Sequence, residues 1–286
     1  MISPINMTRR TFVPAIAGLG MAPVQAAAAA RKGRLKQCVT GGCFGGRNSK
    51  LSFEEQCREA AQMGVVGYDL RGPQDFPILK KYGLIPTMVP GGSTIPDGTN
   101  DKALHDGIEK RMRDAIDAAA QAGAPNVIAL SGNRKGRSDE EGLANTVTYF
   151  NRIKKHAEDK GVTICLELLN SKVNHPDYQC DHTAWGVEVC KRVGSARVKL
   201  LYDIYHMQIM EGDVIRTIKD NFQYIGHFHT AGNPGRHEMD DTQEMNYRGI
   251  AKAIADLGYQ GYVAHEYSPL GDPLVSLEAT LKMFEV

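Results

Sequence analysis

Short apolar segments that are typical of strands alternate with helix-like segments from residue 31 to the C-terminus. This alternation limits the possible folds more than any other feature, because strands separated by helices form parallel sheets. The expected strands cover residues 35–39, 65–70, 84–89, 126–130, 162–168, 198–203, 224–229 and 262–266. The expected helices cover residues 52–63, 73–82, 102–121, 138–158, 185–193, 214–220, 244–257 and 274–284. Eight strands, each followed by a helix, predict an α/β protein with a single closed (β/α)8 TIM barrel.

An open, doubly wound sheet is the competing fold. Such a sheet usually has fewer strands and a glycine-rich phosphate-binding turn after the first one. Glycine-rich residues 41–46 do follow the first expected strand, but they lack the G-x-G-x-x-G order and no helix follows them immediately. The chain of 286 residues also shows no linker and no shift in composition between two parts. We therefore expect residues 31–286 to form one catalytic barrel domain.

Residues 1–30 have the composition of a targeting segment. The sequence TRRTF at residues 8–12 precedes a modestly apolar run, and VQA at residues 24–26 provides the small residues found at signal cleavage sites. This pattern resembles a twin-arginine export signal. The alternative is an arginine pair that opens an amphipathic helix of the mature protein. Export predicts a periplasmic protein, and an export route that carries folded proteins suits a metal enzyme.

The charges of the chain argue against a nucleic-acid partner. Lys and Arg together number 34 and Asp and Glu together number 33, so the net charge is +1 and no broad basic surface is expected. The apolar runs are shorter than the ~20 residues that a membrane-spanning helix needs. We therefore expect a small-molecule substrate and no membrane span, and we leave open an association of identical chains.

Four successive expected strands end in side chains that can bind a metal, namely Glu167, Asp203, His229 and Glu266. In a barrel the carboxyl ends of the strands meet at one rim, where the active site lies. Three carboxylates at this rim would repel one another unless a cation held them together. A ligand set of three oxygens and one imidazole nitrogen suits Mn²⁺ or Mg²⁺, with Co²⁺ or Zn²⁺ as alternatives. We predict a divalent-metal site formed by these four residues.

The seventh expected strand carries two histidines, His227 and His229, on one face because side chains alternate along a strand. His229 lies nearer the C-terminal end, where the other ligands gather, so we assign it to the metal. We assign His227 to a hydrogen bond that supports the site, and include it among the residues expected around the substrate.

Several segments together resemble a known family. These segments are CLELLN at 165–170, LYDIYHMQIMEGD at 201–213, GHFHTAGNPGRHE at 226–238, GYVAHEY at 261–267 and SGNR at 131–134. They are similar to the metal and substrate motifs of the hydroxypyruvate isomerase branch of the xylose-isomerase-like TIM barrels, and to the related ketose 3-epimerases. Two positions differ from that branch. Residue 229 is histidine, which is usual in the epimerases, and Tyr68-Asp69-Leu70 stands where the relatives usually carry a glutamate.

The resemblance implies a metal-dependent isomerase or epimerase that acts on a sugar or a hydroxy-keto acid. The carbonyl and hydroxyl oxygens of such a substrate bind the metal, and the C–H between them becomes acidic because an enediolate is stabilised. One carboxylate removes the proton and a group on the other side of the site returns it to the adjacent carbon or to the opposite face. We expect Glu167 and Glu266 to be this catalytic pair, with different pKa values.

The same motifs imply substrate-binding residues. Arg236, in a Pro-Gly turn, is expected to bind a substrate carboxylate or hydroxyl, and Glu238 or His237 is expected to hold it in place. His206 and Asn170 are expected near the substrate oxygens. The alternative for Arg236 is a salt bridge to Asp240 or Asp241 that only fixes the loop.

Three other functions compete with an isomerase. A metal-dependent lyase or dehydratase that acts on a 3-oxo sugar or cyclitol would use the same metal and an enolate, and export slightly favours this function. A non-catalytic sugar-binding protein would not need a second acid at Glu266. A nuclease would need several metals and a basic groove, which the net charge of +1 opposes.

Overall fold

The computed structural model describes Met1 and residues 31–286, so the expected export signal lies outside the described residues. Within them, parallel strands form one sheet in the order β3-β2-β1-β8-β7-β6-β5-β4. The strands are β1 Lys36–Val39, β2 Gly67–Asp69, β3 Ile85–Met88, β4 Asn126–Ala129, β5 Thr163–Glu167, β6 Val198–Asp203, β7 Ile225–Thr230 and β8 Tyr262–His265. The helices are α1 Phe53–Gln62, α2 Phe76–Lys81, α3 His105–Ala122, α4 Asp139–Lys160, α5 Thr183–Val193, α6 Ile204–Met210, α7 Val214–Asn221, α8 Tyr247–Asp256 and α9 Pro273–Met283.

The sheet curls until its two edge strands, β3 and β4, meet. Their contact is a single bridge between Val89 and Val127, supported by backbone hydrogen bonds from Val89 N to Asn126 O (2.9 Å) and from Ile128 N to Val89 O (3.0 Å). Every other strand pair along the sheet is joined by a parallel ladder, with a register shift in the β2–β3 and β6–β7 pairs. The predicted single (β/α)8 barrel is therefore confirmed as an eight-stranded, near-closed barrel.

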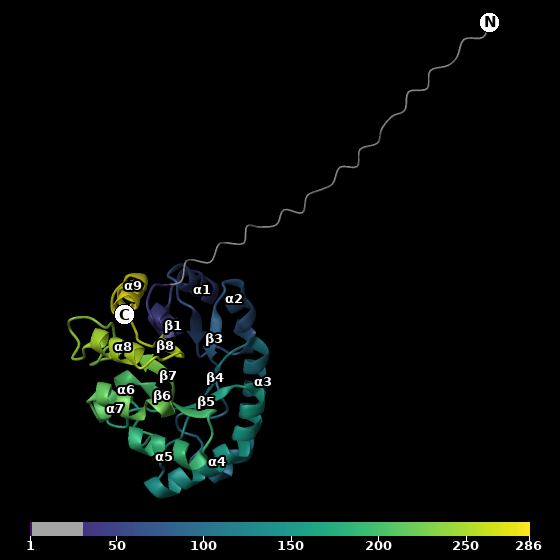
Figure 1. Cartoon of the computed structure of the whole chain (residues 1–286), viewed down its shortest axis with the longest axis vertical. Coiled ribbons are helices and arrows are strands. Elements are labelled where there is room, and N and C mark those ends of the chain that lie inside the picture. Colours follow the sequence, from purple (N-terminus) through teal and green to yellow (C-terminus); the bar gives the residue numbers. More distant parts are fainter. Residues whose placement is uncertain (2–30) are drawn as a thin grey trace.

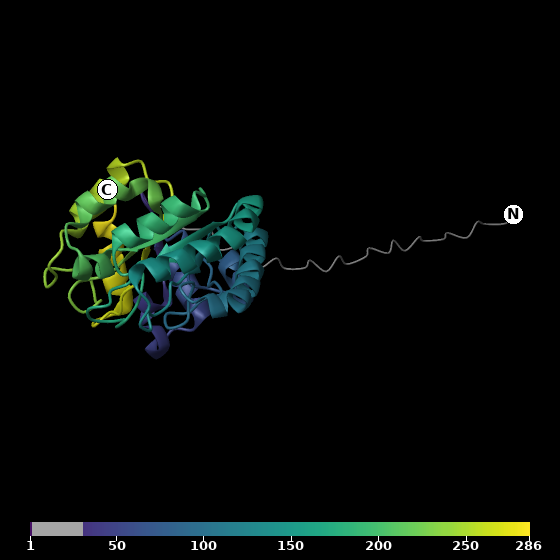
Figure 2. The same ribbon diagram turned by 90° about the horizontal axis from the view of Figure 1, so that it is seen from below.

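Helices surround the strands in both views (Figures 1 and 2). Local sequence signals fix several helix ends. Ser52 and Glu55 form a reciprocal capping box at the start of α1, and Gly123 ends α3 in the left-handed conformation that glycine adopts without strain. The last helix, α9, lies beside the first strand, because Gln37 Nε2 donates a hydrogen bond to Leu281 O (3.1 Å). The C-terminal helix thus completes the outer layer.

The structure contains one α-helix that the sequence pattern did not predict. Helix α6 begins directly after β6, and Asp203 caps it by accepting a hydrogen bond from the backbone N–H of His206 (3.2 Å). The expected helix at residues 73–82 is divided into a 3-10 turn at Pro73–Asp75 and helix α2. Within residues 31–286, the helices lack the combination of length and apolar character that a membrane span requires.

The barrel interior places polar residues above an apolar layer. Met88, Ile128, Cys165 and Leu201 form a small buried cluster that is separate from the main core. Because side chains alternate along a strand, Cys165 shares its face with Glu167, and Leu201 shares its face with Asp203. The acids therefore stand at the C-terminal rim, one step above these apolar side chains.

Candidate active site

The structure brings together the four residues predicted to bind a metal. One possible ligand atom from each of Glu167, Asp203, His229 and Glu266 lies within 4.8 Å of the corresponding atoms of the other three. His229 Nδ1 is 2.8 Å from Glu266 Oε2 and 3.4 Å from Glu167 Oε1. Strands β5, β6 and β7 and the residue after β8 supply these groups, as expected for a site at the carboxyl rim.

His229 has the environment of a metal ligand. Its Nε2 lies 3.0 Å from Asp69 Oδ2, within hydrogen-bonding distance, whereas its Nδ1 is buried and has no hydrogen-bond partner of suitable geometry. A hydrogen bond at Nε2 fixes the ring and leaves the Nδ1 lone pair facing the carboxylates. The donor set fits a divalent cation, because three acids and one imidazole nitrogen converge on one small volume.

The charge on His229 responds to the acids around it. Burial alone would lower the pKa of this imidazole, but the negative charge of Glu266 and the hydrogen bond with Asp69 raise the pKa well above its ordinary value. A divalent cation would supply the same positive charge in place of the proton, because a metal-binding imidazole must be neutral. The site is therefore built to hold positive charge at this point.

Asp69 is a site residue that the sequence analysis noticed only as a departure from the relatives. Its Oδ2 lies 2.6 Å from His227 Nε2 and 3.0 Å from His229 Nε2, and Thr87 donates to its other oxygen. Burial alone would raise the pKa of Asp69, but the two imidazoles lower it far below its usual value. The available signal was an acid at the end of the second strand, the same signal that identified Glu167, Asp203 and Glu266.

His227 supports the site from below and is not in contact with the cavity. Its side chain is fully buried, with Nε2 against Asp69 and Nδ1 3.4 Å from Asn126 Nδ2. These contacts match the supporting hydrogen bond expected from the sequence. The other expectation, that His227 lies among the residues around the substrate, stays a prediction.

Arg236 extends into the acidic cluster. Its Nη2 donates to Asp203 Oδ2 (2.9 Å) and to Glu266 Oε2 (2.7 Å), its Nη1 lies 2.6 Å from His206 Nε2, and its guanidinium lies 4.9 Å from the centre of the Tyr205 ring. Burial would lower the pKa of Arg236, but the acids raise it, so the charge is permanent. The alternative salt bridge to Asp240 or Asp241 is wrong, because the arginine pairs with the predicted metal ligands.

The expectation that Glu238 or His237 holds Arg236 is also wrong. Glu238 Oε1 accepts hydrogen bonds from the backbone N–H groups of Leu270 (2.7 Å) and Gly271 (3.0 Å), and His237 Nδ1 lies 3.0 Å from Ser268 O. Both side chains join the loop after β7 to the loop after β8. Closeness in sequence to Arg236 did not predict these contacts. The partners of a loop side chain depend on which other loops the fold places beside it.

His206 and Asn170 lie next to Arg236 and continue its network away from the acids. His206 Nδ1 is 2.5 Å from Asn170 Nδ2, while Asn170 Oδ1 accepts from the backbone N–H groups of Val173 and Asn174. Burial lowers the pKa of His206 to about 3, and Arg236 adds to this effect, so the ring is neutral near pH 7. His206 thus presents a neutral polar group beside the arginine.

Glu167 and Glu266 have pKa values displaced in opposite directions, in agreement with the expectation from the sequence. Burial raises the pKa of Glu167, and the nearby charges of Glu266 and Asp203 raise it further. Burial alone would also raise the pKa of Glu266, but Arg236 and His229 lower it to about 2. One carboxyl group therefore holds a proton more readily while its neighbour stays ionised, which is the asymmetry that an acid–base pair needs.

A cavity of about 260 Å³ opens at the rim beside this cluster. The loops after β1, β2, β7 and β8 form its walls, and Arg71, Arg236 and Glu266 are the charged side chains that line it beside the buried Asp69. The volume lies below the range of roughly 300–1,000 Å³ that is usual for drug-sized ligands, so the cavity suits a small polar molecule.

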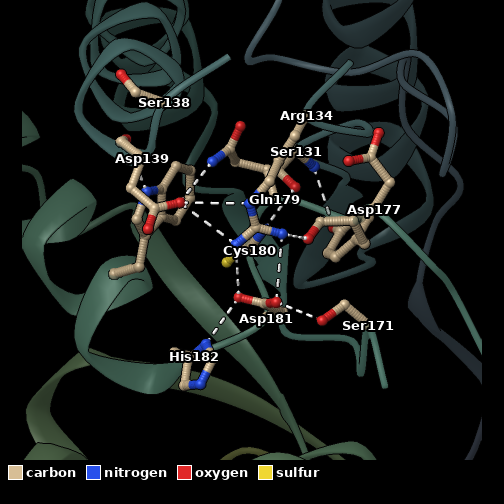
Figure 3. Close-up of polar contacts among 12 residues, drawn as sticks. Ser131, Arg134, Ser138, Asp139, Ser171, Asp177, Gln179, Cys180, Asp181 and His182 are labelled. Atoms are coloured by element: carbon tan, nitrogen blue, oxygen red, sulfur yellow. Dashed lines mark hydrogen bonds and ion pairs between the residues drawn. The ribbon is translucent and has the colours of Figure 1, made fainter. Parts of the chain in front are cut away.

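A second polar network connects the loops after β4 and β5 (Figure 3). Arg134 Nη2 donates to Asp181 Oδ1 (3.0 Å), Ser171 Oγ donates to Asp181 Oδ2 (2.5 Å), and His182 Nδ1 lies 2.8 Å from Asp181 Oδ1. Burial alone would raise the pKa of Asp181, but hydrogen bonds from Arg134, Ser171 and His182 lower it. This network fixes the segment that carries Asn170, the residue before Ser171. Arg134, the last residue of the SGNR motif, thus stabilises the conformation of these loops.

The near-closed barrel and the buried acid–imidazole cluster at its carboxyl rim define a TIM-barrel protein with a polar candidate site. The model of the family described as "Xylose isomerase-like TIM barrel" matches residues 77–284, and the chain belongs to this family. This confirms the resemblance found in the sequence.

Curated relatives of the chain carry isomerase names. It is 40% identical over 113 residues to a 2-oxo-tetronate isomerase of Cupriavidus necator, a match that covers 40% of the chain and 43% of the relative. It is 30% identical over 236 residues to a hydroxypyruvate isomerase of Escherichia coli, covering 77% of the chain and 89% of the relative. The match to the first of these therefore spans less than half of that relative's length.

Solved structures show the same fold at lower sequence identity. A protein described as an AP endonuclease, family 2, from Brucella melitensis has a TM-score of 0.74 and 24% identity, covering 87% of the chain and 99% of that structure. A 3-keto-D-glucoside 4-epimerase from E. coli has a TM-score of 0.73 and 21% identity, covering 87% and 98%. At these identities the likeness concerns the fold alone.

Proposed function

We propose that this protein is a divalent-metal-dependent isomerase or epimerase that moves a proton within a small sugar or hydroxy-keto acid. The observation that carries the proposal is the convergence of Glu167, Asp203, His229 and Glu266, whose possible ligand atoms lie within 4.8 Å of one another, with Glu167 and Glu266 both close to His229 Nδ1. The isomerase names of the curated relatives support the same reaction class. A sugar-binding protein would need the metal but not a second acid at Glu266.

The site residues would divide the work as follows. Glu167, Asp203, His229 and Glu266 would hold a divalent cation, which when bound would polarise the substrate carbonyl and stabilise negative charge on its oxygen. One of the two glutamates removes the proton from the carbon beside the carbonyl, and the other glutamate returns a proton to the neighbouring carbon or the opposite face. Arg236 donates hydrogen bonds to the substrate oxygens, and neutral His206 keeps the arginine fork oriented.

The proposal is tested by incubating the purified protein with Mn²⁺ or Mg²⁺ in D₂O and offering hydroxypyruvate, tetruloses, free hexuloses and 3-oxo sugars in turn. Proton NMR should show an isomerised or epimerised product that carries deuterium at the carbon receiving the proton. A dehydrated product would instead support the lyase or dehydratase. Saturable binding of these compounds without any conversion would overturn the proposal in favour of a binding protein.

Arg236→Lys is expected to lower kcat/KM by roughly 10–150-fold, or about 1.5–3 kcal/mol, mainly by raising KM. Lysine keeps the charge but cannot reach Asp203, Glu266 and His206 at once with a planar fork. The measurement compares Arg236→Lys with the parent protein in metal content, melting temperature and steady-state kinetics. A lower melting temperature with unchanged kcat/KM would show that the arginine serves only to hold the loop.

We propose further that residues 1–30, which lie outside the described residues, direct export to the periplasm. The basis is the TRRTF sequence at 8–12 and the VQA sequence at 24–26. Expression of the full chain in a bacterium with a twin-arginine pathway should yield a periplasmic protein whose N-terminus, determined by mass spectrometry, lies near residue 27. Replacing Arg9 and Arg10 by lysine should leave it in the cytoplasm. Unchanged export of that variant would contradict the proposal.

A further inference from the structure

The cavity at the rim contains a second guanidinium group, which the mechanism proposed above does not use. Arg71 lies in the loop after β2, whereas Arg236 comes from the loop after β7, and both line the same cavity of about 260 Å³. Glu266 lies on the side of Arg236, to which it is hydrogen bonded at 2.7 Å. The reacting end of a substrate would therefore lie toward Glu266, and Arg71 would face another part of the same molecule.

Arg71 is held in place chiefly by aromatic rings, and its charge is only weakly paired. Its guanidinium carbon lies 4.2 Å from the centre of the Phe53 ring and 4.8 Å from that of Tyr68. Nη2 donates to Tyr68 Oη at 3.3 Å, and the nearest acid among the described residues, Asp75, is 3.6 Å from Nη1. An arginine has five N–H donors, so most of them remain free for a ligand in a fixed orientation.

The loop after β1 leaves space for this arginine through two glycines. A Cβ atom at Gly41 would lie 2.9 Å from Arg71 Nη2, and a Cβ atom at Gly42 would lie 2.9 Å from the carbonyl oxygen of Tyr267. Side chains at these positions would therefore displace the guanidinium or narrow the cavity. The glycine pair keeps the Nη2 edge of Arg71 next to the open space.

We propose that Arg71 binds the carboxylate of the substrate and so makes this protein selective for short hydroxy-keto acids over neutral ketoses. The inference rests on the proposed function. It adds the class of substrate and the residue that recognises the substrate carboxylate. A carboxylate can pair with the free donors of Arg71 in a charge-assisted, two-point contact, while its 2-oxo group reaches the Glu266 side of the cavity. A neutral hydroxymethyl group at the same place would pair poorly with a partly desolvated cation.

The test compares two substrates that differ only in this group, hydroxypyruvate and the neutral triose dihydroxyacetone. Arg71→Met should lower kcat/KM for hydroxypyruvate by about 10–100-fold, largely through KM, and change the value for dihydroxyacetone less than about threefold. Arg71→Lys should retain part of the selectivity, because it keeps the charge. Arg58→Met, on the neighbouring helix α1 and away from the cavity, is the matched control and should behave like the parent protein.

Binding of a non-reacting acid separates this inference from the proposed reaction. Calorimetry should show that glycerate binds the metal-loaded protein at least tenfold more tightly than glycerol, and that Arg71→Met removes this preference while the melting temperature stays within a few degrees. If glycerate binds through Arg71 but no substrate is turned over, the proposed isomerase activity is wrong, whereas the proposed carboxylate site at Arg71 stands. The proposed role of Arg71 is wrong if Arg71→Met lowers kcat/KM equally for the acid and the neutral substrate. It is also wrong if the parent protein shows no preference for glycerate over glycerol.

Discussion

Replacing either glutamate of the proposed acid–base pair is expected to lower kcat by about 10²–10⁴-fold. Glu266→Gln removes a carboxylate that Arg236 and His229 keep ionised, and Glu167→Gln removes the carboxyl group whose pKa burial raises. Glutamine preserves the size of each side chain but can neither accept nor deliver the proton. Steady-state kinetics and the incorporation of solvent deuterium measure the loss.

Glu238→Gln is the matched control for these variants. Glu238 belongs to the same rim, but its carboxylate accepts hydrogen bonds only from the backbone of Leu270 and Gly271, which a glutamine oxygen can also accept. This variant should keep nearly full activity. An unchanged kcat in Glu266→Gln would assign the proton transfer to another carboxylate of the cluster.

Loss of a predicted metal ligand is expected to remove both the ion and the activity. His229→Ala deletes the only nitrogen ligand, and Asp203→Asn deletes one of three negative charges that converge within 4.8 Å. Elemental analysis should find the ion in the parent protein and a strongly reduced amount in the variants. Dialysis against a chelator should abolish activity, and Mn²⁺ or Mg²⁺ should restore it.

The melting temperature provides a readout of the same site without turnover. An ion that binds only the folded protein adds about 2.7 kcal/mol of stability at one hundred times its Kd. Added Mn²⁺ should therefore raise the melting temperature of the parent protein but not that of His229→Ala. His182→Ala, in the loop network after β5, removes a histidine outside the cluster and should still respond to the ion. Full activity of a metal-free protein would contradict the assignment.

The barrel and its rim could be predicted because both follow from local periodicity. A strand that is mostly apolar and then ends in an acid identifies its own carboxyl end, as β5 does at Glu167 and β6 does at Asp203. Helix α6 escaped prediction because it is only 7 residues long and begins without an intervening loop. Its start is fixed by the Asp203 cap, which becomes evident only once the strand end is known.

Contacts between loops could not be predicted, because they depend on which loops the barrel closure makes adjacent. Asp69 contacts two histidines that follow it by 158 and 160 residues, and no local pattern records that separation. No local pattern predicted the contact of Glu238 either, whose carboxylate accepts a hydrogen bond from the loop after β8. Arg71 had no sequence signal of its own, since its significance comes from sharing a cavity with Arg236.

The weak junction between β3 and β4 has a consequence for how the molecule accommodates motion. All four predicted ligands and Asp69 are supplied by β2 and by β5 to β8, strands that have a hydrogen-bonded neighbour on each side. The two edge strands carry none of them. We therefore expect motions that open the barrel to begin at the β3–β4 junction, where a single bridge joins the strands, and to leave the spacing of the predicted ligands largely unchanged.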